Sequence, residues 1–391
     1  MAKRKTGLEE FYILKNNKKL HYGYTTGTCA AAASKAAAEM LLSGHKVQEV
    51  ELMTPKGIPL CLEIEEISIE REKVSCAVRK DGGDDPDATH GILIFSTVKK
   101  IPEKKIAIDG GSGVGRVTKK GLEQRVGNAA INRVPREMIA HELKEICEAM
   151  DYEGGISVEI SVPEGEKIAK KTFNPKLGIE GGISILGTSG IVIPMSEEAL
   201  IASIRVEMEM KKANGAQYLL ITPGNYGADF CRSQLELNLD HAMKCSNYVG
   251  ETIDMAVSSG IKGILFVAHL GKFIKVAGGI MNTHSRCADS RAEILASNAI
   301  RAGASLETAK RLLDTVTTDE AISILNETGQ TEAVMKKVTE KIRFYLQNRA
   351  NGMIETEAVI FSNEHGFLGK TEGADRLLNR IKADEKNENR V

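Results

Sequence analysis

The second half of the chain repeats one pattern, in which a short apolar run is followed by a glycine-containing loop and then a helical segment. Residues 218–221 and 264–267 are continuous apolar runs, and the spacing predicts helices over about 196–215, 247–260 and 288–300. Such runs are typical of parallel strands that are buried on both faces. Repeated strand–helix alternation covers the sheet with helices on both sides. We therefore predict a Rossmann-like α/β domain with a mostly parallel sheet over residues 178–379.

The first half has a different pattern. An alanine-rich segment after Thr28 predicts one helix, with Thr28 as its N-cap and Gly44 as its left-handed stop. Apolar and polar residues then alternate around 50–64, 74–78 and 156–162, as in strands with one buried face. A second helix is predicted near Pro135. We predict a mixed α+β domain with antiparallel strands over residues 1–177, and a charged, frayed tail over residues 380–391.

The composition excludes several classes of protein. Lys+Arg (52) and Asp+Glu (53) nearly cancel, and aromatic residues make up 4% of the chain, which disfavours a nucleic-acid partner. The seven cysteines are scattered without a Cys-x-x-Cys pair, which indicates a reducing compartment and no zinc cage. No apolar run approaches the roughly 20 residues of a membrane span. The sequence thus predicts a soluble, cytoplasmic protein without a metal site or a membrane partner.

Two loops leave alternatives open. In the glycine-rich segment 178–190, Gly182 and Gly187 are spaced like the start of a phosphate-binding loop, but Thr188 stands where lysine is needed. This segment is either a pair of tight turns or a loop that lets a cofactor approach the backbone. The acidic segment 81–91 lacks calcium-loop spacing. It is either a solvated turn, a cation-binding loop or the source of a carboxylate that removes a proton or orients a substrate.

Polar residues are concentrated after the second buried strand. His269, Lys272 and Lys275 follow that strand, and residues 282–291 add further histidine and arginine side chains. Ligands of doubly wound sheets bind at the carboxyl ends of strands, and arginine pairs well with carboxylates. An anionic ligand is therefore expected here. A solvated loop is the alternative, and metal binding by His269 and His284 lacks an obvious third ligand.

Six motifs occur in order along the chain, at residues 23–32, 85–91, 132–136, 181–190, 269–272 and 282–285. Together these motifs resemble the CbiD family, the cobalt-precorrin-5B C-1-methyltransferases of anaerobic cobalamin synthesis. The resemblance implies methyl transfer from S-adenosylmethionine to C-1 of a ring-contracted tetrapyrrole, giving cobalt-precorrin-6A. Cobalt would arrive only as part of that substrate. Two other functions stay open, an ATP- or phosphate-ester-using enzyme and a non-catalytic tetrapyrrole carrier, and a homo-oligomer is compatible with the sequence.

The resemblance also leads to expected site residues. For the catalytic group we expect His284 or His90 as proton acceptor, because imidazole titrates near neutral pH, with Asp87 beside them. For S-adenosylmethionine we expect the glycine loops, namely Gly181, Gly182, Gly187, Thr188, Gly190, Thr222, Gly224 and Gly227. For the polycarboxylate macrocycle we expect His269, Lys272, Lys275, Asn282, Thr283, Ser285, Arg286, Thr25, Thr26 and Thr89. The hypothesis requires the glycine loops and the cationic side chains to open into one cleft.

Overall fold

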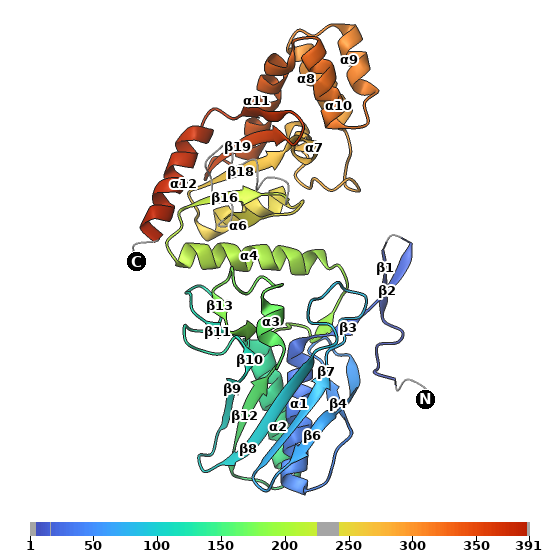
Figure 1. Ribbon diagram of the computed structural model, residues 1–391, viewed down its shortest axis with the longest axis vertical. Helices are drawn as coiled ribbons and strands as arrows, with labels where there is room; N and C mark the ends of the chain where they lie inside the picture. The colour runs from blue at the N-terminus through green and yellow to red at the C-terminus, as the bar shows by residue number, and fades with distance from the viewer. Residues whose placement is uncertain (1–4, 16, 225–241, 389–391) are drawn as a thin grey trace. The chain divides into compact units, whose positions relative to one another are not determined.

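The computed structural model describes residues 5–15, 17–224 and 242–388 (Figure 1). Its contacts divide the chain into two units, Met1–Glu197 and Glu198–Val391. The boundary predicted between residues 177 and 178 falls inside unit 1. The reason is that the segment after residue 178 pairs with earlier strands: β13 (Ile179–Glu180) with β11 (Arg116–Val117), β14 (Gly182–Ile183) with β10 (Gly113–Val114), and β15 (Ile191–Val192) with β3 (Gly23–Tyr24).

Unit 1 contains a five-stranded sheet with the order β6-β7-β8-β12-β9. Neighbouring strands are antiparallel except for the parallel pair of β12 and β9. The bounds are Glu65–Ile69 for β6, Lys73–Arg79 for β7, Leu93–Ile101 for β8, Gly155–Ser161 for β12 and Ile106–Gly110 for β9. The alternating segments around 74–78 and 156–162 are thus confirmed as strands.

Helices α1 (Thr26–Ser43) and α2 (Arg133–Ala149) pack side by side, and α1 lies against β7 and β8 (Figure 1). Seven alanines of α1 are fully buried, so the helix approaches the sheet closely. The predicted stop is confirmed, because Gly44 has φ 76° and its N–H bonds the Met40 carbonyl. The cap, however, is Thr25 rather than Thr28: the Thr25 hydroxyl accepts the Thr28 N–H at 3.2 Å.

Short elements complete unit 1. Two hairpins, β1 (Tyr12–Lys15) with β2 (Lys18–His21) and β4 (Glu49–Met53) with β5 (Pro59–Glu63), are antiparallel. The second hairpin turns at residues 54–57, where the Gly57 N–H bonds the Thr54 carbonyl at 2.8 Å. A short helix, α3 (Gly165–Ala169), follows β12.

Unit 2 contains a second five-stranded sheet with the order β17-β16-β18-β19-β20. The first four strands are parallel and β20 runs antiparallel to β19. The bounds are Met243–Lys244 for β17, Tyr218–Thr222 for β16, Gly263–His269 for β18, Glu355–Ser362 for β19 and Gly366–Lys370 for β20. Both apolar runs predicted as buried strands are therefore strands of a mostly parallel sheet.

Helices cover both faces of this sheet. Leu219, Ile264 and Phe266 belong to the core that contains helix α6, whereas Leu220 and Leu265 belong to the core that contains helix α12. The helices are α4 (Glu197–Ala213), α6 (Val249–Ser259), α7 (Leu270–Phe273), α8 (Arg291–Arg301), α9 (Leu306–Leu313), α10 (Thr318–Glu327), α11 (Thr331–Arg349) and α12 (Ala374–Glu388), with a 3-10 turn at Ile274–Gly278. Strands covered by helices on both faces need apolar side chains on both faces, which explains the continuous apolar runs at 218–221 and 264–267.

The prediction of a frayed tail from residue 380 is wrong. Helix α12 continues to Glu388, and Ile381 is 2% exposed because it packs with Leu377 against the sheet. The helix predicted from residue 288 begins later, at Arg291. Across the described ranges of the chain, every helix is too short or too polar to cross a lipid bilayer.

Candidate active site

The expected site residues fall on both units. Unit 1 contains Thr25, Thr26, Asp87, Thr89, His90, Gly181, Gly182, Gly187, Thr188 and Gly190. Unit 2 contains Thr222, Gly224, His269, Lys272, Lys275, Asn282, Thr283, His284, Ser285 and Arg286. Gly227 lies outside the described residues. Because the glycine loops of unit 1 and the cationic side chains of unit 2 belong to different units, a single cleft that joins them stays a prediction.

In unit 1 the glycine-rich loop packs on the first turn of α1. The Gly27 N–H donates to the Leu186 carbonyl, and the Thr25 N–H donates to the Gly190 carbonyl, both at 3.0 Å. The Thr26 hydroxyl accepts the Leu186 N–H at 2.9 Å. Thr25 and Thr26 are buried and their hydroxyls bond protein groups. Thr25 and Thr26 thus hold the loop in this structure, and their expected contact with substrate stays a prediction.

Most glycines of this loop are explained by close packing. A Cβ on Gly187, whose φ is 139°, would lie 2.2 Å from the Thr25 hydroxyl oxygen. A Cβ on Gly182 would lie 2.1 Å from the Gly113 carbonyl oxygen. Tight turns are therefore the alternative that fits these positions. Gly181 and Thr188 are exposed, and a Cβ on Gly181 would meet no atom within 4 Å.

The acidic loop of unit 1 is held by its own side chains. Lys80 is 2% exposed, and its Nζ lies 2.9 Å from Oδ2 of Asp87. Oδ1 of Asp87 accepts the backbone N–H and the hydroxyl of Thr89 at 2.8 and 2.7 Å. Burial alone would raise the pKa of Asp87, but Lys80 and Thr89 outweigh it and hold the pKa below its usual value. Asp87 is therefore an ionised anchor and a weak base.

His90 closes the same loop. Its Nδ1 accepts the Gly82 N–H at 3.1 Å, so in the neutral ring the proton lies on Nε2. The side chain of His90 is 57% exposed. Of the three residues expected to be catalytic, His90 and the exposed His284 can reach solvent, and neither role is tested by these contacts.

In unit 2 the strand order brings the segments that follow β16 and β18, which contain expected site residues, to one edge of the sheet. The chain passes from β16 to β17 on one side and then to β18 on the other, so the direction of winding changes between β16 and β18. Doubly wound sheets bind ligands at the carboxyl ends of strands at such a point. Thr222 ends β16 and His269 ends β18, with Gly224 and Lys272 in the residues that follow.

Asn247, which the sequence analysis placed only at the start of a predicted helix, links the polar loops at this edge. Its Oδ1 accepts the Lys272 ammonium at 3.0 Å, and its carbonyl accepts the Thr283 N–H at 2.9 Å. Asn282 forms an isolated bridge with the neighbouring Tyr248. The 269–272 and 282–283 segments thus lie together at this edge of the sheet.

The ammonium of Lys275, which was expected to bind substrate, forms its hydrogen bonds inside the protein. Lys275 is 3% exposed, and its ammonium donates to the carbonyls of Thr283 and Ala288 at 3.2 and 2.8 Å. Burial lowers its pKa. Lys275 therefore holds the loop that carries His284, Ser285 and Arg286, which are exposed together with Lys272.

His269 is positioned by local contacts. Its Nδ1 accepts the Gly271 N–H at 3.0 Å and caps α7, and its ring packs edge-on against Phe361 with centroids 5.5 Å apart. Burial lowers the pKa of His269, although Asp319 opposes the shift. A neutral ring at this edge suits a shape or hydrogen-bond contact better than ion pairing.

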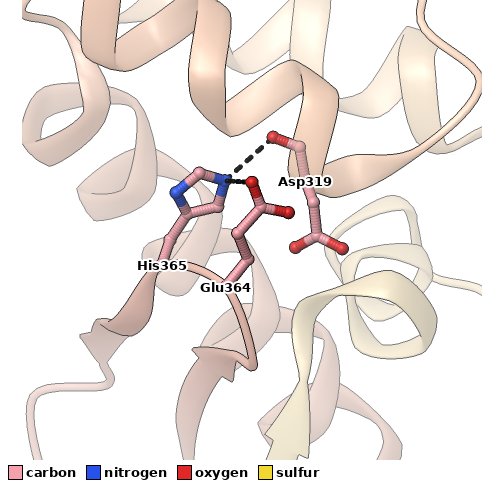
Figure 2. Close-up of side chains that lie close together, drawn as sticks. All are labelled: Asp319, Glu364 and His365. Carbon is pink, nitrogen blue, oxygen red and sulfur yellow. Dashed lines mark hydrogen bonds and ion pairs between the residues drawn. The ribbon is translucent and has the colours of Figure 1, made fainter.

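A cluster that sequence reasoning missed lies beyond β19. Figure 2 shows His365 turned toward the Asp319 backbone carbonyl, 3.0 Å from Nε2, and toward the Glu364 carboxylate, 4.0 Å away. The Asp319 side chain accepts the Ser362 hydroxyl at 2.6 Å. These residues could offer three ligand atoms to a metal ion. Nε2 of His365, however, faces a carbonyl oxygen and so carries its proton, and the contacts indicate a link between α10 and the β19–β20 turn.

Comparisons with known proteins agree on one family. The CbiD family model matches residues 13–194, and the model of the CbiD C-terminal domain matches residues 282–372. A cobalt-precorrin-5B C(1)-methyltransferase of Ruminiclostridium cellulolyticum is 56% identical over 91% of this chain and 92% of its own length. One from Alkaliphilus metalliredigens is 47% identical, over 96% and 98%.

A solved structure is also similar. It is described as a cobalamin biosynthesis protein (cbiD) from Archaeoglobus fulgidus, is 26% identical, and has a TM-score of 0.38 over 81% of this chain and 88% of that chain. The family models and the relatives cover most of the sequence at high identity. This chain therefore belongs to the CbiD family.

Proposed function

We propose that this protein methylates C-1 of cobalt-precorrin-5B, uses S-adenosylmethionine as the methyl donor and releases cobalt-precorrin-6A. The observation that carries the proposal is the 56% identity to a cobalt-precorrin-5B C(1)-methyltransferase along nearly the whole of both chains. The structure supports a ligand site at the edge of the unit 2 sheet, which we interpret as a doubly wound, Rossmann-like sheet. A cytoplasmic location and a homo-oligomeric assembly stay predictions.

The reaction is an in-line displacement. The donor supplies an electrophilic methyl group on a sulfonium, the new bond forms between that carbon and C-1, and the carbon–sulfur bond breaks to leave S-adenosylhomocysteine. Alignment at about 3 Å contributes more to such a step than an activated side-chain nucleophile. The chain's residues therefore need to bind, orient and exclude water.

For the macrocycle we propose the exposed cations at the unit 2 edge. Lys272 and Arg286 are exposed and can pair with peripheral carboxylates, while Asn282, His284 and Ser285 add polar groups on the neighbouring loop. His269 and Thr283 set the shape of this edge through their bonds to Gly271 and Asn247. Thr89 of unit 1 is engaged by Asp87 and is not retained as a ligand.

For the donor two segments remain candidates. In unit 1 these are the exposed Gly181 and Thr188, and in unit 2 the part-exposed Gly224 after the buried Thr222. Gly182, Gly187 and Gly190 pack against other backbone and side-chain atoms. These atoms fill the space beside each Cα. Titration of S-adenosylhomocysteine into Thr188→Val and Gly224→Val variants separates the two segments.

The proposed function is tested by incubating the purified chain with cobalt-precorrin-5B and methyl-labelled S-adenosylmethionine. We expect one labelled methyl group in the macrocycle, and a Lys272→Ala/Arg286→Ala variant with at least about tenfold weaker macrocycle binding. Lys310→Ala, an exposed lysine on α9, is the matched control. Macrocycle binding without label transfer would indicate a carrier instead. Stabilisation by ATP-Mg but not by S-adenosylmethionine would indicate a phosphate-using enzyme.

A further inference from the structure

Unit 1 has an open cavity beside the first turns of α2 that the proposed reaction does not yet use. Its volume is about 410 Å³, within the usual range of small-ligand sites. It is lined by Ile108, Glu123, Gln124, Arg133, Arg136, Glu137 and Ala140. Arg133 and Arg136 come from the motif at 132–136, for which the sequence suggested no role.

Arg136 brings a positive charge without a counter-ion to this cavity. Its Nε and Nη1 donate to the carbonyls of Ile131 and Ile108, each at 2.8 Å. Asp109, the nearby carboxylate, is held by Arg116 through two bonds of 2.8 and 3.0 Å. Within the described part of the chain, Arg136 forms no ion pair. A half-buried guanidinium with unused N–H donors favours an anion beside it.

The same cavity carries an excess negative charge around Arg133. Glu137 accepts the Arg133 guanidinium at 2.8 Å, and Glu123 accepts the Arg133 backbone N–H at 2.8 Å. Glu123 also lies 3.9 Å from Nε of Arg133, so two carboxylates share one guanidinium. The lining as a whole offers one uncompensated cation, one uncompensated anion and the apolar side chains of Ile108 and Ala140.

We propose that this cavity binds an α-amino acid group, with its carboxylate on Arg136 and its ammonium on Glu123 and Glu137. A simple carboxylate would be repelled by the two glutamates, and a simple ammonium by Arg136, whereas a zwitterion matches both. This inference rests on the proposed function, because the methyl donor proposed there, S-adenosylmethionine, carries an α-amino acid group at its methionine end. A free amino acid has the same chemistry.

The cavity is joined by hydrogen bonds to one of the two donor candidates. The Asn132 N–H, at the start of α2, donates to the Ile185 carbonyl at 3.0 Å, and Ile131 and Ile185 form a bridge. Ile131 in turn accepts the Arg136 guanidinium. The loop that carries Gly181 and Thr188 is therefore held to the residues that position Arg136.

Calorimetric titration of the full chain tests the assignment with three probes. S-adenosylhomocysteine keeps the amino acid group, 5′-methylthioadenosine lacks it, and methionine is the group alone. We expect Arg136→Gln and Glu137→Gln each to weaken S-adenosylhomocysteine binding, by about tenfold or more for Arg136→Gln. Binding of 5′-methylthioadenosine should change less than about twofold. Arg125→Gln, an exposed arginine outside the cavity, should leave all three affinities unchanged.

The outcomes separate the inference from the proposed function. If Arg136→Gln and Glu137→Gln lower the affinity for S-adenosylhomocysteine and 5′-methylthioadenosine equally, the two residues have a structural role and the inference is overturned. Unchanged S-adenosylhomocysteine affinity with a raised KM for the macrocycle would assign Arg136 to a macrocycle carboxylate and also overturn it. If the wild type transfers no methyl group, the proposed function fails, yet Arg136-dependent binding of methionine would still support the cavity with a free amino acid as its ligand.

Discussion

The ammonium of Lys80 lies 2.9 Å from a carboxylate oxygen of Asp87, and the side chain of Lys80 is 1% exposed whereas that of Asp87 is 23% exposed. The pair ties the end of β7 to the turn that carries Thr89 and His90. A buried ammonium needs acceptors that replace its lost hydration, and here a carboxylate supplies them, so this contact holds the acidic loop in place. The acidic segment is thus a built turn rather than an open collection of carboxylates.

Breaking this pair should destabilise unit 1. We expect Lys80→Met to lower the free energy of unfolding by about 3 kcal/mol, because Asp87 loses its ion-pair partner in a partly buried place. Urea denaturation measures the change, and Lys73→Met, at the start of β7 and part-exposed, is the control. A loss no larger than that of the control would show that the pair contributes little.

The two loop glycines at 181 and 187 should respond differently to alanine. Gly187→Ala places a Cβ against the Thr25 hydroxyl at a φ of 139°, so we expect a loss of about 3 kcal/mol from overpacking and backbone strain. Gly181→Ala, at φ 80° with open space around it, should cost about 1 kcal/mol. Thermal unfolding of both variants checks the difference, and equal losses would contradict the packing account.

Elements with strong periodicity could be predicted from the sequence, and short pairings could not. The alternation at Val74, Cys76 and Val78 identified β7 because each of these residues is buried against helix α1. The unit boundary was missed because β13, β14 and β15 are two residues long and pair with strands far away in the sequence. Such strands have no period to detect.

The same limit applies to side chains whose neighbours are distant. Lys272 and Lys275 look alike in the sequence, yet one is exposed and the other is sealed by the carbonyls of Thr283 and Ala288. The tail was misjudged for a different reason. Its many charges hid Leu377 and Ile381, which are four residues apart and form the buried stripe of α12.

Stability near neutral pH should depend on His269. The pKa of His269 is lowered in the folded chain, so on acidification the unfolded chain binds a proton at this residue first. Stability therefore falls as the pH drops below the pKa of the unfolded chain, about 6.5, toward the lower pKa of the folded chain. His269→Asn keeps an acceptor for the Gly271 N–H but does not titrate there. Between about pH 7.5 and 5.5 the variant should show a shallower loss of unfolding free energy. Parallel curves for the two proteins would contradict this.

The two lysines after β18 should separate stability from binding. Lys275→Met leaves the carbonyls of Thr283 and Ala288 without their donor, so we expect a loss of about 1–3 kcal/mol in unfolding free energy. Lys272→Met should leave stability nearly unchanged, because Lys272 is exposed and, among the residues that the structure describes, its ammonium bonds only Asn247. The KM for the macrocycle, in contrast, should rise about tenfold in Lys272→Met, since one charged contact is lost. Urea denaturation and steady-state kinetics on both variants provide the comparison. If Lys275→Met raises the KM without any change in stability, Lys275 reaches the substrate and the loop-holding role assigned to it is wrong.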